Sequence, residues 1–516
     1  MHWASLTLLA ASGAAAGVTA TGSAPMLAET NPVYFDDQKT FHPNDPLQTS
    51  QPIEGANGRN IFHLMGNLSP YFVPEEGFGV DEYPLPEDAK ISQVHLLHRH
   101  GSRYPTDAEP YELWAQKIQN ATAQGTRFTG GLSFLNDYSW RQGVNILVPK
   151  GRQELFESGV LHFYNYGALY RNSSKLLVRS TSVERVVKST KNFLAGFFGL
   201  DWQERADILQ LIAAPGFNSS LTGTSVCKNA DKLSTSPGIE AASEWRENYL
   251  KGKTETLKRW AGDFNWTVTD TANAQTLCPY ETVSFGYSPF CALFNYKEWE
   301  GFSYSTSILF SSTMGFGSPV TRATGIAWVE EFLARVNGHL LDVPAGLTSA
   351  NLTLDTNPDT FPLDQPLFFD FGHDISIMAV LTAFGITQFA DFLPASGPPS
   401  HQQYYAERVT PFAARLNIEI IDTPHQVTTR RSKNNKEDYV FDTGKTKYVH
   451  FVLNQRTVPL HASFKECEYR DDGWCELNTF LEVQESSLEK AQFQYSCNGD
   501  WEMGPYGSVT DGVPAQ

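Results

Sequence analysis

The sequence is poor in charged residues and, beyond its first 20 residues, has no long hydrophobic run. Charged residues make up 19% of the 516 residues and aromatic residues 13%, a composition typical of a well-buried globular protein. No later stretch approaches the roughly 20 apolar residues that a membrane-spanning helix needs, so we expect no membrane partner. The chain is longer than a single core comfortably fills, which favours one large domain and a second one.

Positive charge is scarce as well. The chain has 39 Lys and Arg against 57 Asp and Glu, which gives a formal net charge of −18 at pH 7. Such an acidic protein repels nucleic acids and anionic membrane surfaces, and we expect neither as a partner. It also repels a phosphate ester at long range. Any phosphate site in this protein must therefore be made positive locally.

Several chemical motifs are absent from the sequence. It has no C-x-x-C pair, which makes a zinc or dithiol redox centre unexpected. It has neither the G-x-S-x-G of serine hydrolases nor the G-x-x-x-x-G-K-[ST] of P-loop proteins. The cysteines are even in number and indicate disulfide bonds in an oxidising compartment, with pairings that the sequence alone leaves open. They are Cys227, Cys278, Cys291, Cys467, Cys475 and Cys497.

Residues 1–20 have the pattern of a secretory signal peptide. A short apolar core at 6–11 is followed by small residues at 18–20, although His2 is the one basic side chain of the leader. N-x-S/T sequons are also present, so we predict a secreted protein that carries N-glycans. The sequons are Asn67, Asn120, Asn172, Asn218, Asn265 and Asn351, of which Asn67 is disfavoured by the proline after its serine.

A dense polar cluster follows the apolar, strand-like run at residues 91–97. It is the stretch His98–Pro105, with the sequence HRHGSRYP. Arg99 and Arg103 carry planar forks that suit phosphate oxygens. His100 between them is a side chain that can attack phosphorus and leave again. A strand that ends shortly before a helix is a frequent anion site, so this stretch predicts phosphate chemistry.

This polar cluster has two other possible interpretations, filler side chains and a metal site. The polar side chains could be core or surface filler, but so many costly groups rarely follow a strand without a function. His98 and His100 lie two residues apart on a strand, and could bind a metal ion together with His95 or a distant carboxylate. Arg99 and Arg103 would add positive charge beside such an ion, and we therefore expect no metal.

The segment His98–Pro105 resembles the R-H-G-x-R-x-P signature of the histidine acid phosphatases, the family of fungal phytases and secreted acid phosphatases. Residues 178–181, VRST, resemble the segment that carries a third phosphate-binding arginine in this family, here Arg179. The pair His373 and Asp374 resembles the family's His-Asp pair. Residues 452–461 are similar to another segment of the fungal members, so the resemblance runs from about residue 55 to the end.

The resemblance implies a cofactor-free acid phosphatase that acts on phosphate monoesters, phytate included, at acidic pH. His100 would form a phosphohistidine, and Asp374 would protonate the leaving alcohol and then activate water. The phosphate would be bound by Arg99, Arg103, Arg179 and His373. The resemblance also suggests the disulfides Cys278–Cys291, Cys467–Cys475 and Cys227–Cys497. Positions 100, 179 and 373 all fall at predicted strand-to-helix junctions and are expected to meet in one crevice.

Alternating strands and helices predict an α/β fold, with a central, mostly parallel sheet flanked by helices and an inserted, mainly helical cap domain. We expect an extended N-terminal arm over 21–87, a discontinuous catalytic domain over 88–182 and 322–516, and the cap over 183–321. The basic loop 430–436 is expected to be solvated. Predicted strands lie at 175–178, 367–371, 417–421 and 448–453, and predicted helices at 111–122, 149–170, 183–198, 323–336 and 375–384.

Two functions other than phosphatase activity also fit part of this sequence pattern. A noncatalytic phosphate-binding protein would need the arginines but not both His100 and Asp374. A phosphoglycerate-mutase-type enzyme shares the Arg-His-Gly core, but the signal peptide and disulfides place this chain outside the cell. The substrate range is expected to be broad, because the segment 106–112 after the signature is acidic and 303–312 has no Lys or Arg with which to hold many phosphates.

Overall fold

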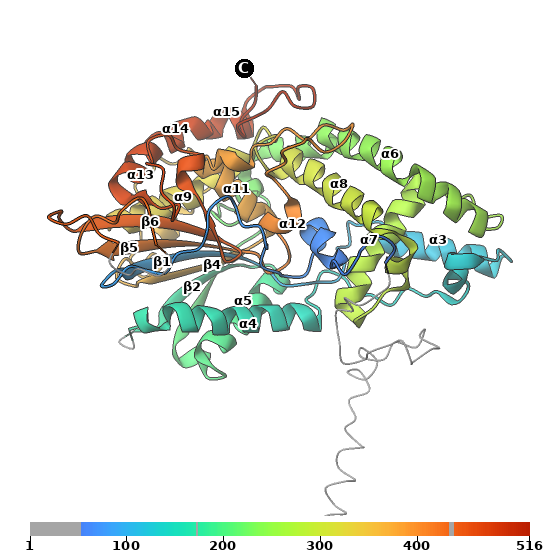
Figure 1. The fold of residues 1–516 in the computed structure, drawn as a ribbon, viewed down its shortest axis with the longest axis horizontal. Coiled ribbons are helices and arrows are strands. Elements are labelled where there is room, and N and C mark those ends of the chain that lie inside the picture. The colour runs from blue at the N-terminus through green and yellow to red at the C-terminus, as the bar shows by residue number, and fades with distance from the viewer. Residues whose placement is uncertain (1–52, 172–173, 433–437, 516) are drawn as a thin grey trace, which may run out of the picture.

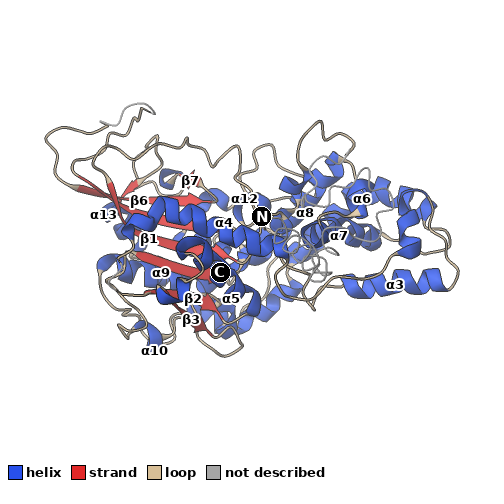
Figure 2. Cartoon of the chain, turned by 90° about the horizontal axis from the view of Figure 1, so that it is seen from below, coloured by secondary structure: helices blue, strands red, loops and turns tan. Residues whose placement is uncertain are grey.

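The computed structural model describes residues 53–171, 174–432 and 438–515. The predicted signal peptide and the first part of the predicted arm lie outside these residues, as does the sequon at Asn172. A central sheet with helices on both faces stands beside a mainly helical region (Figures 1 and 2). The strands are β1 (Lys90–Arg99), β2 (Leu176–Thr181), β3 (Ala206–Leu211), β4 (Leu367–Gly372), β5 (Arg415–Thr423), β6 (Thr446–Leu453), β7 (Arg456–Val458) and β8 (Cys475–Glu476).

The strands form one mixed sheet in the order β3-β2-β4-β1-β5-β6-β7, with β8 pairing on β6. Strands β1 to β4 are mutually parallel, and β5 is antiparallel to both β1 and β6. Most strands therefore run in one direction, which confirms the predicted α/β class. The parallel strands are buried on both faces, as their continuous apolar runs require.

Two cores cover the two faces of the sheet. Successive side chains of a strand point to opposite faces, so Leu96 joins the core under α4 and α5, whereas Leu97 joins the core under α9 and α11. The longer helices are α3 (Tyr111–Ala123), α4 (Pro149–Tyr166), α5 (Glu184–Phe198), α6 (Pro237–Trp260), α7 (Val268–Phe285), α8 (Tyr296–Met314), α9 (Thr321–Asn337), α11 (Asp374–Phe384) and α13 (Leu477–Gln484). The short ones are α10 (Leu352–Asp355), α12 (Ala406–Val409), α14 (Ser487–Ala491) and α15 (Phe493–Asn498).

The helical region has its own core, built largely from aromatic side chains of α3, α7 and α8 such as Trp114, Tyr280 and Trp299. Its bounds differ from the predicted cap of 183–321. Strand β3 pairs with β2 and α5 packs on the sheet, so the start of that range belongs with the sheet. Conversely, α3 precedes the predicted cap but lies in the helical core. Helical periodicity alone could not show which core each helix covers.

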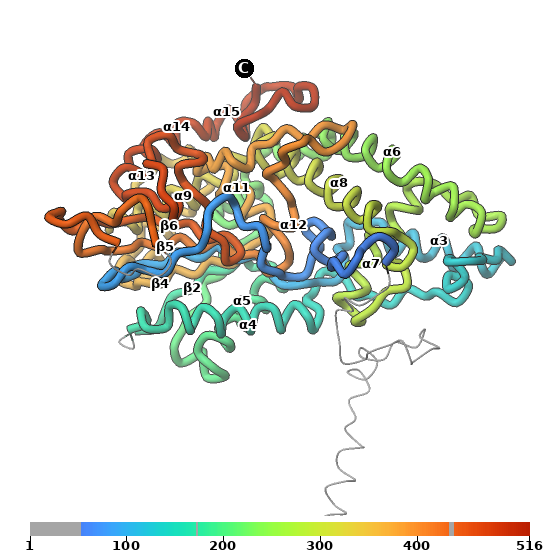
Figure 3. The backbone as a smooth tube through the Cα atoms, viewed as in Figure 1, coloured from blue at the N-terminus to red at the C-terminus, as the bar shows by residue number. Residues whose placement is uncertain are grey.

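Residues 53–87 run over the body as an extended segment with two short 3-10 helices, η1 (Ile61–Leu64) and η2 (Gly66–Leu68). In Figure 3 this blue segment passes along α12 towards the strands. The amide and hydroxyl of Thr457 donate to the Glu82 carboxylate at 2.9 and 2.6 Å. These bonds hold the segment to the antiparallel edge of the sheet.

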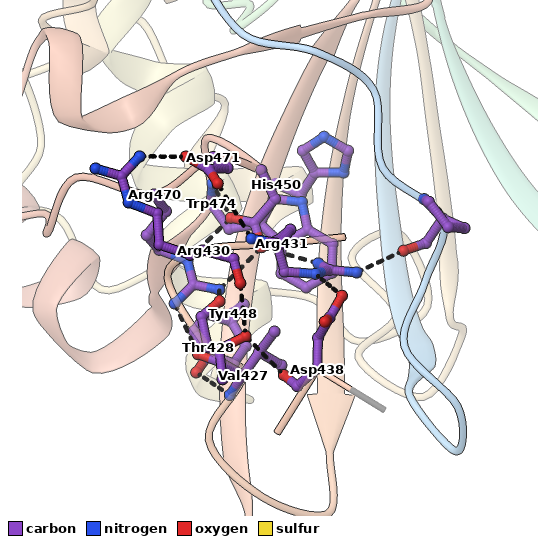
Figure 4. Close-up of polar contacts among 12 residues, drawn as sticks. Val427, Thr428, Arg430, Arg431, Asp438, Tyr448, His450, Arg470, Asp471 and Trp474 are labelled. Atoms are coloured by element: carbon purple, nitrogen blue, oxygen red, sulfur yellow. Dashed lines mark hydrogen bonds and ion pairs between the residues drawn. The ribbon is translucent and has the colours of Figure 1, made fainter. Parts of the chain in front are cut away.

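The prediction of a solvated basic loop at 430–436 is wrong for Arg431. Its guanidinium is buried and forms an ion pair with Asp438 at 2.9 Å (Figure 4). A second ion pair joins it to Asp472, also at 2.9 Å. It also donates to the carbonyl of Pro84 at 2.8 Å, which ties the N-terminal segment to this loop. Residues 433–437 lie outside the described part of the chain. The arginine is buried because two acidic partners neutralise it, Asp438 within the same loop region and Asp472 farther along the chain.

The three predicted disulfides are confirmed, and they use every cysteine of the chain. Cys278–Cys291 joins α7 to the 3-10 helix η8 (Pro289–Leu293), and Cys467–Cys475 closes a short loop before α13. Cys227–Cys497 links the segment after β3 to α15 near the end of the chain. Within the described ranges, no helix combines the length and the hydropathy needed to span a lipid bilayer.

Candidate active site

The site lies where β1 and β4 end side by side. The two strands are parallel neighbours with Arg99 opposite Gly372, so the residues that follow each strand meet at the same edge of the sheet. His100 follows β1, and His373 lies between β4 and α11. Their ring centroids are 5.5 Å apart. Of the three positions expected to meet, 100, 179 and 373, the structure thus brings His100 and His373 together.

His100 is a neutral imidazole with one nitrogen available. Its Nδ1 lies 2.8 Å from the carbonyl oxygen of Gly101, and because a carbonyl only accepts, Nδ1 carries the proton. Burial, followed by the charge of Arg99 and that of Arg185, lowers the pKa of His100 well below its ordinary value. The Nε2 atom therefore keeps its lone pair even in acid, as a nucleophile requires.

The loop that holds His100 packs tightly on the start of α4. A Cβ on Gly101 would lie 2.3 Å from the carbonyl oxygen of Gly151, so no larger residue fits there. The buried carboxylate of Glu154 accepts hydrogen bonds from the Ser102 amide at 2.8 Å and the Ser102 hydroxyl at 3.0 Å. These contacts fix the backbone on which His100 stands.

Arg99 is buried beside Asp374. One guanidinium nitrogen, Nη1, donates to the carbonyls of Asn67 and Thr410, and the other, Nη2, lies 2.8 Å from the Asp374 carboxylate. Burial lowers the pKa of Arg99 to about 10, against the opposing effect of Asp374, so the side chain stays charged at acidic and neutral pH. Its Nε has no hydrogen-bond partner among the described residues, and is available for an anion.

The Arg103 guanidinium makes its hydrogen bonds to the protein through one nitrogen, Nη1. Its Nη1 donates to the carbonyl of Tyr104 at 2.9 Å, the Tyr280 hydroxyl at 3.2 Å and the Glu109 carboxylate at 3.3 Å. Burial raises the pKa of Tyr280 well above its ordinary value, so the phenol keeps its proton and donates to Glu109. The buried Nε of Arg103 has no partner within the described ranges. The donors of Arg99 and Arg103 that remain are those a phosphate oxygen would occupy.

Asp374 is the first residue of α11 and the one carboxylate of the His-Asp pair. Burial would raise its pKa, but Arg99, the hydrogen bond from Asn67 and the neighbouring His373 outweigh burial and lower it. Asp374 is therefore a carboxylate when the site holds no phosphate. Burial and the charge of Arg185 lower the pKa of His373 to about 3, so His373 is a neutral hydrogen-bonding group in that state.

Asn67 takes part in the site although its sequence context indicated only a sequon. Its Nδ2 donates to Oδ2 of Asp374 at 3.1 Å, from the short helix η2 of the N-terminal segment. This nitrogen is the one that an N-glycan would occupy, and a glycan there would remove the bond. The half-buried position of Asn67 agrees with the disfavoured sequon.

Comparison with known proteins shows the family to which this chain belongs. Residues 90–454 match the Histidine phosphatase superfamily (branch 2). The chain belongs to this superfamily. Phytase A of Aspergillus fumigatus is 29% identical over 436 residues, covering 81% of this chain and 87% of the relative. Phytase A of Arthroderma benhamiae is 28% identical over 455 residues, covering 85% and 91%. This histidine phosphatase is accordingly a phosphoric monoester hydrolase.

Solved structures show the same fold as this histidine phosphatase. The phytase from D. castellii has a TM-score of 0.65 and 21% identity, covering 86% of this chain and 89% of the other. A Bifidobacterium longum multiple inositol polyphosphate phosphatase in complex with phosphate has a TM-score of 0.53 and 12% identity, covering 83% and 98%. At such identities the likeness concerns the arrangement of the elements.

Arg179 does not belong to the site, which corrects the prediction that it binds phosphate. Its guanidinium forms a two-pronged pair with Asp370, with Nε at 2.7 Å from Oδ1 and Nη2 at 2.8 Å from Oδ2. Nη2 also donates to Glu331 of α9. The side chain is buried on a face of the sheet and its donors are directed at carboxylates. Arg179 is therefore a structural residue of this histidine phosphatase.

Arg185 is the arginine that the sequence reasoning missed. It lies in the first turn of α5, six residues after Arg179, and its buried Nε has no hydrogen-bond partner among the described residues. Its positive charge lowers the pKa values of both His100 and His373, after the larger effect of burial. The helix start after a strand was a usable signal, because that position is where anions bind.

Two substitutions separate these arginines. Arg179→Met is expected to lower the free energy of unfolding by about 3–5 kcal/mol, because it removes the cation paired with the buried Glu331 and leaves the buried Asp370 with only the longer pair to Arg335 at 3.5 Å. Arg185→Ala is expected to change that free energy by less than about 1 kcal/mol while it weakens phosphate inhibition by about 10- to 100-fold through a lost charged hydrogen bond. Urea unfolding and phosphate inhibition measure the two effects, and the reverse pattern would restore Arg179 to the site.

The other histidines of β1 have structural contacts. His98 is buried, with Nδ1 2.7 Å from the carbonyl oxygen of Arg99 and Nε2 2.8 Å from the Ser158 hydroxyl. His95 stacks on Phe368 on the opposite side of the strand. Across the described ranges, no group of three or more His, Cys, Asp or Glu side chains is arranged to hold a metal ion. His98 therefore supports the strand that carries the signature.

Proposed function

We propose that this histidine phosphatase is a secreted acid phosphatase that hydrolyses phosphate monoesters through a phosphohistidine intermediate. The observation that carries the proposal is the position of His100, whose free Nε2 lies among the buried Arg99 and Arg103, the half-buried Arg185 and the carboxylate of Asp374. The signal-like leader and the disulfides support secretion, since disulfides persist in oxidising compartments.

In the first step Nε2 of His100 attacks phosphorus, and the bond to the ester oxygen breaks. Arg99, Arg103 and Arg185 offset the negative charge on the nonbridging oxygens, and His373 donates an N–H to one of them. Asp374 gives its proton to the departing alkoxide, so that an alcohol leaves. In the second step the Asp374 carboxylate takes a proton from water, which attacks phosphorus and releases inorganic phosphate and free His100.

The substrate supplies the proton that Asp374 needs. Asp374 is ionised in the free site, because its pKa is lowered, whereas a phosphate ester keeps one proton below its second pKa of about 6. Binding brings a negative charge next to Asp374 and favours transfer of the ester's proton to the carboxylate. We therefore expect the reaction to be fastest at acidic pH, although the pKa of Asp374 is not raised in the free site.

The pH profile is expected to follow this proton. For an alkyl phosphate, kcat/KM should fall about tenfold per pH unit above roughly pH 6, where the ester loses its last proton. It should not fall as pH decreases through about 6.5, the ordinary pKa of histidine, because the pKa of His100 is far lower. Steady-state rates between pH 3 and pH 9 measure both limbs. A rate that holds level to pH 8 would contradict the assignment.

The overall activity is tested by assaying the full-length secreted protein at acidic pH. We expect release of inorganic phosphate from an aryl phosphate and from a sugar phosphate, with one alcohol formed per phosphate. The similarity to Phytase A of Aspergillus fumigatus and of Arthroderma benhamiae supports phytate as a further substrate. A protein that binds phosphate but releases none from either ester would refute the proposal in favour of a binding protein.

A further inference from the structure

We propose that Glu109 selects against substrates with several phosphate groups, so that this site prefers an ester with one phosphate on an uncharged alcohol. The inference rests on the proposed function, because it concerns the same site. Glu109 lies in the turn between the signature and α3, beyond the reacting groups. Its role would be to set which alcohols enter, and it takes no part in the chemical steps.

Glu109 is fixed in place by hydrogen bonds on both carboxylate oxygens. Oε2 accepts from the Thr106 amide and from its hydroxyl at 2.8 Å, and lies 3.3 Å from Nη1 of Arg103. Oε1 accepts from the hydroxyl of Tyr280, a buried residue of α7. A side chain held at four points cannot swing into solvent when a charged ligand arrives. The carboxylate is therefore a permanent feature of the entrance.

The Glu109 carboxylate faces both the site and the solvent. Its side chain is 25% exposed, whereas that of Arg103 beneath it is 11% exposed. Glu109 contacts the Nη1 corner of the Arg103 guanidinium, and the opposite Nε edge is the unpartnered one. A phosphoryl group bound at the Nε edge would therefore be separated from the Glu109 carboxylate by the width of the Arg103 guanidinium. The proposal places the alcohol part of the substrate on the solvent side, next to this partly exposed carboxylate.

The charge discriminates between substrates by what lies next to the reacting phosphate. Arg99, Arg103 and Arg185 compensate the reacting group itself, and of these Arg99 and Arg103 are buried while Arg185 is half-buried. We place a second phosphate on the same alcohol towards solvent, on the side of the partly exposed Glu109, whose contact with Arg103 already occupies the Nη1 corner of that guanidinium. Two charges about 8 Å apart at a partly screened surface change affinity by roughly tenfold. A hydroxyl group in the same position meets no such repulsion.

The test compares the binding of two inert anions to Glu109→Gln, which removes the charge and keeps the shape. The anions are orthophosphate and inositol hexasulfate, titrated by calorimetry at pH 6. We expect the Kd for orthophosphate to change less than about threefold and the Kd for the hexasulfate to fall by about tenfold. Glu112→Gln, on the exposed side of α3, loses the same charge and should change neither value.

Each outcome decides the proposal. Equal changes for both anions would make Glu109 merely a support for Arg103, and equal changes in Glu112→Gln would reduce the effect to net charge. Either result overturns the selection role, as does an unchanged hexasulfate Kd. If Glu109→Gln folds poorly, Glu109→Lys provides the same comparison with an expected fall of about 100-fold for the hexasulfate. Absence of turnover would refute the phosphatase function separately, because these readouts require binding alone.

Discussion

Replacing His100 by alanine is expected to lower the turnover of every phosphate ester by at least about 10³-fold, because it removes the proposed nucleophile. A phosphoryl group on histidine is lost in acid, so labelling is measured with a radioactive ester and a quench that preserves phosphohistidine. The wild-type protein should retain label on His100, and the variant should retain none. The fold should persist, since the imidazole makes its one side-chain hydrogen bond to the adjacent backbone.

The matched control for this substitution is His339→Ala. His339 lies just after α9 on the surface, far from the signature in sequence, and should tolerate the change without loss of rate. A His100→Ala protein that still hydrolyses esters and still takes up label would refute His100 as the nucleophile. The phosphate site would then need another acceptor, and the roles proposed for its neighbours would fail with it.

Replacing Asp374 by asparagine has the second largest expected effect, and its size depends on the leaving group. An alkyl phosphate releases a poor leaving group that needs a proton, so its kcat should fall by about 10²- to 10⁴-fold. An aryl phosphate with an electron-poor ring leaves as a stable anion, so its first step should slow by less than about tenfold. Burst kinetics separate the two steps, because Asp374 also activates water in the second one.

Asp342→Asn is the control, since Asp342 is an exposed aspartate that follows α9. It should leave the rates on both esters unchanged. Equal losses on alkyl and aryl esters in the first step of Asp374→Asn would remove this carboxyl from the acid role. In that case its pairing with Arg99 at 2.8 Å would have to serve the position of the guanidinium instead.

Much of the site followed from the sequence because its parts lie at strand ends. The signature and the His-Asp pair follow β1 and β4, and a parallel pairing brings the two ends together. The error at Arg179 came from the length of a strand. The predicted strand ended at residue 178, whereas β2 continues to Thr181, so Arg179 is inside the strand and its side chain lies on a sheet face.

Contacts between distant segments were outside the reach of the sequence. Asn67 of the N-terminal segment donates a hydrogen bond to Asp374, and Tyr280 of α7 donates one to Glu109. The sequence around Asn67 and Tyr280 contains no local pattern that predicts these partners. The same holds for Arg431, whose basic surroundings predicted exposure although Asp438 and Asp472 bury it. Pairing energies of buried charges depend on geometry that local spacing does not encode.

The bond between Cys227 and Cys497, which lie 270 positions apart, makes most of the second half of the chain a closed ring. The ring includes β4 and the His-Asp pair, whereas the signature lies outside it. A protease that cuts one exposed loop within this ring would leave a protein of two fragments joined by sulfur. Such a nicked molecule would keep the same mass apart from one added water, would still hold its catalytic parts together, and would separate only in the presence of a reductant.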